Sequence, residues 1–321
     1  MRIIKGVFST VALILLTTCS NNEILEGQTD ENKEIQFVVS SLSRNPVNDV
    51  ADLESFYVWA ANTNNNTEFQ FEQLKVERND AGEWKSSSPQ YWQTGTYNFY
   101  AVTGYKETEP SPVTANLDDN FVITVGDDET NLDLMTAVSS EISYPVVEGE
   151  PSPVAFHFYH EKAQIEISVK AGAQLPDGAT VTGITLSNFY KGGEFTRKFL
   201  DSSNRGSWDF TNVNKTSWEM NKSETIKIIT GGSYSFLSGF MIPAQSLGGV
   251  NLKFSYTISG ASYSKEFELS QIGTTALEAG KINKYNFTIQ PEGIVFDGFT
   301  VPDWGETNTG GNINIGTETN N

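Results

Sequence analysis

The chain has 321 residues, of which 40 are Asp or Glu and 21 are Lys or Arg, so its formal net charge is −19. This excess of acid argues against nucleic acid as a partner, because affinity for nucleic acid comes mainly from Lys and Arg that neutralise phosphates. One cysteine and two histidines fall short of an internal disulfide, and of a four-ligand zinc site without carboxylate help. The length indicates two domains at about 150 residues each.

The N-terminus has the pattern of a secretory signal. Arg2 and Lys5 precede an apolar run over residues 7–16, which is too short for a permanent membrane helix of about 20 apolar residues. Cys19 stands where such a signal is cut, and this arrangement resembles a bacterial lipoprotein box, in which the cysteine carries the lipid. Acylation at Cys19, with palmitate as an expected chain, would anchor the protein in the cell outer membrane. The alternative is a spare cysteine near a cleaved signal.

The polar segment after the cysteine predicts surface exposure. Residues 20–23 (SNNE) resemble the export signal of surface lipoproteins in Bacteroidetes, which favours the outer face of the outer membrane. The chain stays polar and acidic as far as Lys33, which is typical of a solvated tether.

The rest of the chain is predicted to be almost entirely strand and turn. Residues 35–41, 55–61 and 96–103 are rich in aromatic and β-branched side chains with a period of two, and Gly, Pro and Asn turns separate such runs. Short strands of this kind are typical of all-β sandwich proteins.

A domain boundary is expected around residues 144–153, where three prolines and acidic residues separate two strand-rich halves. The predicted divisions are a signal peptide (1–18), a lipidated tether (19–33), an N-terminal sandwich (34–148), a C-terminal sandwich (149–305) and a flexible tail (306–321).

Several short segments resemble the fimbrillin-like proteins of Bacteroidales, the subunits and accessory proteins of type V pili. Their order and spacing carry the resemblance, which covers the signal and nearly all of the remaining chain. The matching segments are residues 133–137 (DLMTA), 158–160 (FYH), 163–167 (AQIEI), 240–243 (FMIP), 280–289 (GKINKYNFTI) and 302–304 (PDW).

The resemblance implies two transthyretin-like β-sandwiches in tandem and assembly with other pilus subunits by strand donation. In stalk subunits of the family, an arginine-specific protease removes an N-terminal strand, and a strand from the next subunit fills the groove. Here Ile35, Phe37 and Val39 lie in the first strand and are the candidates for a donor or acceptor strand. Arg44, followed by Asn45, is the possible maturation site; an ordinary exposed loop arginine is the alternative.

The tail supplies little material for a donor strand, since Ile313 and Ile315 are its only large apolar side chains. This favours a tip, anchor or accessory subunit, or an adhesin with a host or bacterial surface ligand, over a stalk subunit. The alternative function is a glycan-binding surface lipoprotein of a polysaccharide uptake system.

No catalytic, metal or cofactor site is predicted. His157 and His160 are three apart in a strand and so point to opposite faces, and His160 is expected to be a hydrogen-bonded interior residue. The acidic clusters at 118–119 and 127–129 lack the spacing of a calcium loop and are expected to be solvated turns. The tryptophans in strands are expected to be core residues rather than sugar platforms; they are Trp59, Trp84, Trp92, Trp208 and Trp218.

Overall fold

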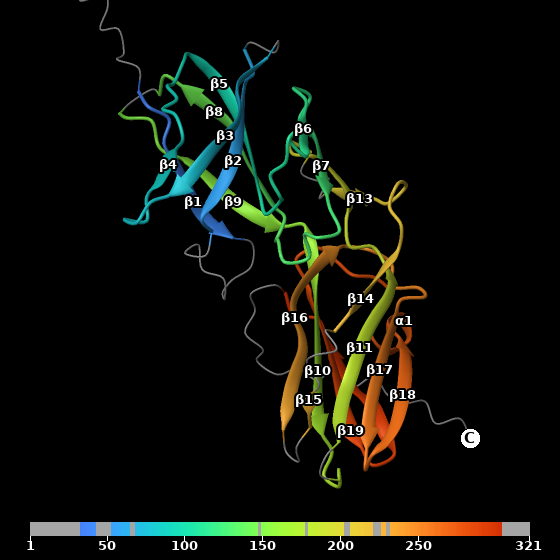
Figure 1. The fold of residues 1–321 in the computed structure, drawn as a ribbon. Coiled ribbons are helices and arrows are strands. Elements are labelled where there is room, and N and C mark those ends of the chain that lie inside the picture. The colour runs from blue at the N-terminus through green and yellow to red at the C-terminus, as the bar shows by residue number, and fades with distance from the viewer. Residues whose placement is uncertain are drawn as a thin grey trace, which may run out of the picture.

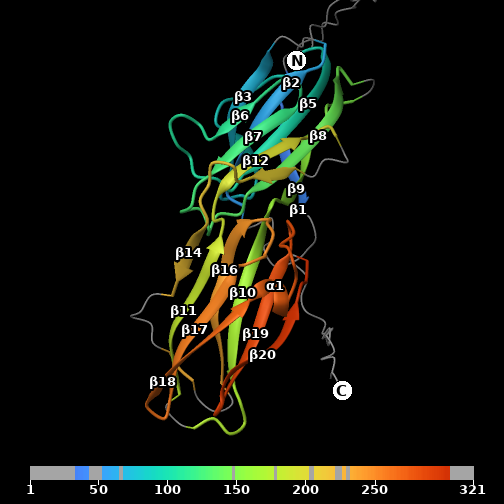
Figure 2. The ribbon, with the colours of Figure 1, turned by 90° about the vertical axis from the view of Figure 1, so that its right-hand side faces the viewer.

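The computed structural model describes residues 33–42, 53–64, 68–146, 149–176, 179–201, 206–220, 226–228 and 232–303. Within these residues nearly every regular element is a strand, and the only helix is the single turn α1 (Leu269–Ile272). The strands form four sheets that are arranged as two units, one above the other along the long axis of the molecule (Figures 1 and 2). The predicted all-β class is confirmed.

The largest sheet lies in the upper unit and has seven strands in the order β1-β9-β8-β5-β2-β3-β4. Its strands are β1 (Phe37–Leu42), β9 (Val154–His160), β8 (Met135–Tyr144), β5 (Gly95–Thr103), β2 (Ser55–Asn62), β3 (Phe69–Arg78) and β4 (Trp84–Ser86). A smaller sheet of four strands packs on one of its faces. That sheet consists of β13 (Ser207–Asp209), β12 (Gly193–Lys198), β7 (Asn120–Val125) and β6 (Val113–Ala115).

The seven-stranded sheet is buried on both faces. Along β5, Tyr97 and Phe99 belong to one buried cluster, whereas Tyr100 and Val102 belong to another. The second cluster lies between the two sheets and contains Phe121 from β7. The first cluster, called the inner core below, is built almost entirely from strands of the seven-stranded sheet itself. Its buried members are Ile35, Phe37, Leu53, Phe56, Val58, Ala60, Leu74, Val76, Trp92, Tyr97, Phe99, Ala101, Met135, Ala137, Tyr144, Val154, Phe156 and Phe158.

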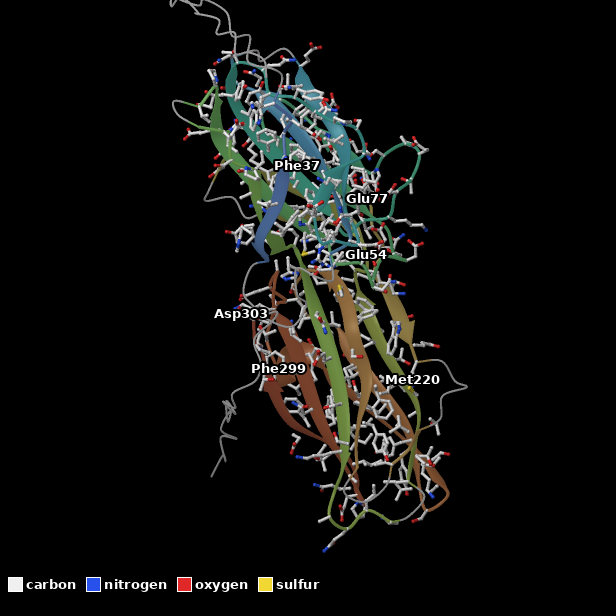
Figure 3. The ribbon with its side chains drawn as sticks, turned by 90° about the vertical axis from the view of Figure 1, so that its left-hand side faces the viewer. Phe37, Glu54, Glu77, Met220, Phe299 and Asp303 are labelled. Carbon is white, nitrogen blue, oxygen red and sulfur yellow. The ribbon has the colours of Figure 1, made fainter. Side chains whose placement is uncertain are left out.

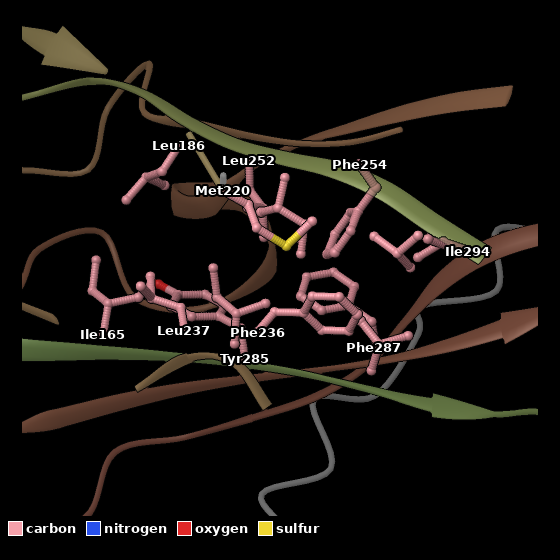
Figure 4. Close-up of a cluster of buried hydrophobic side chains, with 14 of the residues drawn as sticks. Ile165, Leu186, Met220, Phe236, Leu237, Leu252, Phe254, Tyr285, Phe287 and Ile294 are labelled. Atoms are coloured by element: carbon pink, nitrogen blue, oxygen red, sulfur yellow. The ribbon is translucent and has the colours of Figure 1, made fainter. Parts of the chain in front are cut away.

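The lower unit is a sandwich of two sheets around one large core. The first sheet has β16 (Ser233–Pro243), β10 (Lys162–Ala171), β19 (Ile282–Gln290) and β20 (Gly293–Thr300). The second has β14 (Thr216–Glu219), β11 (Thr180–Phe189), β17 (Asn251–Ile258) and β18 (Ala261–Glu268), with β15 (Ile226–Lys227) also paired to β11. Figure 4 shows side chains from both sheets meeting in this core, among them Ile165, Leu186 and Phe287.

The observed division of the chain differs from the expected boundary after residue 148. β9 joins the seven-stranded sheet, and β12 and β13 complete the smaller sheet of the upper unit, although all three lie beyond that boundary. The proline-rich segment 144–153 connects β8 to β9, two neighbours in one sheet, because proline ends a strand without ending a domain. The chain passes to the lower unit at Glu161, the one residue between β9 and β10.

Candidate functional site

The first strand, β1, forms one edge of the seven-stranded sheet. It runs parallel to β9, with Phe37 opposite Val154 and Leu42 opposite Phe158, and a bulge interrupts the register between Val39 and Ser41. Among the described strands, β9 is its only partner in the sheet order. The candidate strand of the sequence is therefore an edge strand held by a single ladder.

The residues just before β1 add a second set of backbone contacts. The Ile35 amide donates to the Gln90 carbonyl oxygen at 2.7 Å, and the Trp92 amide donates to the Lys33 carbonyl oxygen at 2.9 Å. The Val154 amide donates to the carbonyl oxygen of Gln36 at 2.7 Å. These bonds fix the register in which the alternate side chains enter the protein.

Two of the three candidate side chains are embedded in the inner core. Ile35 and Phe37 are 1% and 3% exposed, and Val39 packs against the same cluster while partly buried. The Phe37 ring lies 6.2 Å from the ring of Phe156 and 6.3 Å from that of Phe99, measured between centroids. Figure 3 shows Phe37 within the upper unit. β1 thus contributes large apolar side chains to a core that the other six strands cannot fill alone.

A groove separates β1 from β4, the opposite edge of the same sheet. Residues 34–38 and 82–86 line a cavity of about 260 Å³ between them. Both edges of a sheet can line one cavity only if the sheet curls, and this curl encloses the inner core. Trp84 of β4 contacts Phe56 in that core, with ring centroids 5.0 Å apart.

β9 depends on β1 for most of its pairing. The ladder between β8 and β9 consists of two residue pairs, Met135 with His160 and Thr136 with Tyr159, both at the C-terminal end of β9. Within the described strands, the remainder of β9 pairs with β1 alone. Loss of β1 would therefore leave an edge strand anchored by backbone bonds at one end.

A cluster of buried polar side chains surrounds that anchored end. Glu161 is 1% exposed and accepts hydrogen bonds from Arg197 Nη1 at 2.6 Å and from the Thr136 hydroxyl at 2.5 Å. The indole Nε1 of Trp208 donates to the Glu161 carbonyl oxygen at 3.0 Å. Glu161 and Arg197 carried no signal in the sequence, because they come from segments distant in the chain and neither belongs to a motif.

The residue that begins β10, Lys162, is also fully buried. Its Nζ donates to the carbonyl oxygens of Glu129 and Leu132 at 2.8 and 3.0 Å. Burial lowers the pKa of Lys162 to about 8, and the negative charges of Glu129 and Asp133 offset part of that decrease.

The two histidines behave as their spacing predicts. His160 is 6% exposed, and its Nδ1 lies 2.6 Å from Asp133 Oδ2, which confirms a hydrogen-bonded interior residue. His157 is partly exposed, and its ring contacts that of Tyr159. The described part of the chain has no group of three or more His, Cys, Asp or Glu placed to hold a metal ion.

The expectation for the acidic clusters is wrong for two of their members. Asp119 is 9% exposed and accepts the Leu200 amide at 2.6 Å, and Glu129 is 5% exposed and accepts the Gly126 amide at 2.8 Å. Both carboxylates satisfy backbone donors of folded loops, which sequence spacing alone does not reveal.

The tryptophans pack on the cores. Trp59 and Trp92 are buried, and Trp84, Trp208 and Trp218 lie partly buried against the three apolar clusters.

Some of the predicted site residues lie outside the described residues, namely Cys19, Arg44, Asn45 and the tail 306–321. Among the residues described, no helix is long and apolar enough to span a membrane.

Comparison with known proteins places the chain in a family of surface proteins. The fimbrillin-like family profile matches residues 44–304, and the chain therefore belongs to the fimbrillin-like family. No curated protein matches it.

Solved structures share the fold at low sequence identity. A candidate cell adhesion protein from Bacteroides uniformis is 16% identical, with a TM-score of 0.57 over 87% of this chain and 100% of that one. Another from Bacteroides ovatus is 14% identical, with a TM-score of 0.59 over 86% of this chain and 99% of that one.

Proposed function

We propose that the protein is a lipid-anchored subunit of a surface pilus, or an adhesin carried by one, and that it joins its neighbours by exchange of the strand at the β1 position. The observation that carries this proposal is the placement of β1. Ile35 and Phe37 fill the inner core, yet the strand is an edge strand with one ladder partner.

Strand exchange needs a site that is costly to leave empty. Removal of β1 would uncover the backbone groups of β9 and the apolar surface around Phe99 and Phe156, and a strand with matching alternate side chains would cover both again. The new strand would gain main-chain hydrogen bonds from β9 and specificity from the pockets of Ile35 and Phe37.

Arg44 is proposed as the cleavage site because it lies between β1, which ends at Leu42, and β2, which begins at Ser55. A cut after Arg44 breaks the only covalent link between β1 and the rest of the fold. It also separates the lipid proposed on Cys19 from the two folded units. Strand release and release from the membrane would then follow from the same event.

An arginine-specific protease tests the assembly step. Limited digestion of the full-length protein should give a body that begins at Asn45 and forms ladders on a denaturing gel without boiling, whereas Arg44→Gln should remain uncut and monomeric. A cut body that stays monomeric at high concentration contradicts strand exchange.

Membrane fractionation tests the anchor. Cys19→Ala should move the protein from the membrane to the soluble fraction, because the acyl chains supply the binding energy. Cys19→Ala protein that stays with the membrane argues against lipidation.

The weak apolar content of residues 306–321 supports a tip, anchor or accessory position over a stalk position.

A further inference from the structure

The buried polar cluster at the junction of the two units lies where the strand-exchange site is anchored. The backbone of β9 pairs with β8 only through Thr136 with Tyr159 and Met135 with His160. Glu161 follows directly, and its amide donates to the Leu134 carbonyl oxygen at 2.9 Å. Every remaining backbone pair of β9 is made with β1.

The side chains that hold this end come from a hairpin that is distant in sequence. Arg197 belongs to β12 and Trp208 to β13, and these two strands pair with each other through residues such as Phe195 and Trp208. The chain reaches the hairpin from β11 and leaves it into β14, both of which belong to the lower unit. This hairpin of the upper unit is therefore inserted in the chain between two strands of the lower unit, and its Arg197 and Trp208 contact Glu161 at the end of β9.

The contacts between this hairpin and the end of β9 are buried. Glu161 and Arg197 are 1% and 5% exposed, and the guanidinium also donates to the Thr136 hydroxyl. The guanidinium carbon lies 5.0 Å from the ring centroid of Phe199 and 5.7 Å from that of Tyr159 in β9. Charge-assisted hydrogen bonds in such a dry setting are stronger and more directional than those at a surface.

We infer that the β12–β13 hairpin, through Arg197 and Trp208, is the positioning element that keeps β9 in place as an ordered receptor edge when the β1 position is empty. Arg197 and Trp208 are positioning residues that act through Glu161, because neither belongs to the β1 ladder. The inference rests on the proposed function for its purpose, while the anchoring of β9 can be measured separately.

The test uses the full-length chain with a specific protease site inserted after Arg44 and cut once after folding. The cleaved N-terminal segment is then removed by a wash in urea below the unfolding midpoint, so that the β1 position is empty. The probe is a labelled synthetic peptide of residues 33–42, which is the native β1 segment. Its affinity and dissociation rate are measured by fluorescence anisotropy, and hydrogen exchange of residues 154–160 is measured with and without the peptide.

Two variants remove the contacts of Arg197 and Trp208 with Glu161 in different ways. Arg197→Met with Glu161→Gln removes both charges together, which avoids leaving one of them buried and unpaired. Trp208→Phe removes the indole donor together with part of the ring, keeps an aromatic side chain beside Phe195, and serves if the double variant does not fold. The matched control is Glu166→Gln in β10, whose carboxylate pairs with Lys284 at 3.1 Å in the lower unit.

The double variant should bind the peptide about tenfold more weakly, mainly through faster dissociation, and β9 should exchange faster only when the peptide is absent. Trp208→Phe should show a smaller change in the same direction, and Arg197→Lys should recover most of the binding. The control should match the unsubstituted protein. Equal peptide affinity and equal β9 exchange in all variants would overturn the inference.

Failure of the proposed function looks different. If the cut, unsubstituted protein does not take up the peptide at all, strand exchange at β1 is refuted. The exchange rates of residues 154–160 in the peptide-free proteins would still decide whether the hairpin holds β9.

Discussion

Truncation of Phe37 tests whether β1 is held mainly by the inner core. Phe37 is 3% exposed and its ring packs near Phe99 and Phe156, whereas Val38, its neighbour on the opposite face, is 37% exposed. Truncation of a buried phenylalanine to alanine costs about 3–5 kcal/mol, through lost transfer free energy and the cavity left behind. Phe37→Ala should lower the free energy for undocking of β1 by about that amount.

Hydrogen exchange of the β1 amides measures this local free energy, and urea unfolding measures that of the whole protein. A loss of about 3 kcal/mol corresponds to exchange faster by more than about a hundredfold. Val38→Ala is the matched control in the same strand, with an expected effect within about 0.5 kcal/mol. If Val38→Ala accelerates exchange as much as Phe37→Ala does, then backbone pairing rather than the core holds β1, and the reasoning fails.

Two further predictions concern the junction. The pKa of Lys162 is lowered to about 8 in the folded state, so the unfolded chain keeps this proton to a higher pH than the folded protein does. The free energy of unfolding should therefore rise between about pH 8 and 10, by at most about 3 kcal/mol. Lys162→Met should remove this rise in urea titrations, and an equal slope in both proteins would contradict it. Gly104 has φ +75°, and a Cβ added there would lie 1.7 Å from the Asp133 carbonyl oxygen. Gly104→Ala should therefore lower the urea midpoint of unfolding strongly. Gly298→Ala is the control and should leave the midpoint unchanged, because nothing lies within 4 Å of a Cβ added at Gly298. A Gly104→Ala midpoint equal to that of Gly298→Ala would show that the close approach is not required.

The positions of strands in the upper unit were largely predictable from the local pattern of side chains in the sequence. Residues 55–61 and 96–103 coincide with β2 (Ser55–Asn62) and β5 (Gly95–Thr103), because alternation and β-branched or aromatic content act within a few residues. The interior position of His160 followed from the same alternation, since Phe156 and Phe158 share its face and are buried.

The division of the chain into two units was not predictable from the local sequence pattern. Prolines mark the end of β8 at the sequence level, but β9 returns to the same sheet, and the passage to the lower unit at Glu161 has no proline or glycine. The buried pair of Glu161 and Arg197 was equally hidden, because its members are separated by 36 residues and meet only when β12 pairs with β7.

The sequence by itself determined the all-β class, the alternation of Ile35, Phe37 and Val39 in and just before the first strand, and the likeness to fimbrillin-like proteins. Those properties depend on side-chain periodicity and on the order of short segments, which are local. The tertiary structure alone decided that β1 pairs in parallel with β9, that the sheet curls around the inner core, and that the distant β12–β13 hairpin contacts the end of β9. These features depend on contacts between distant parts of the chain, where each residue gains its role from a partner that the neighbouring sequence does not specify.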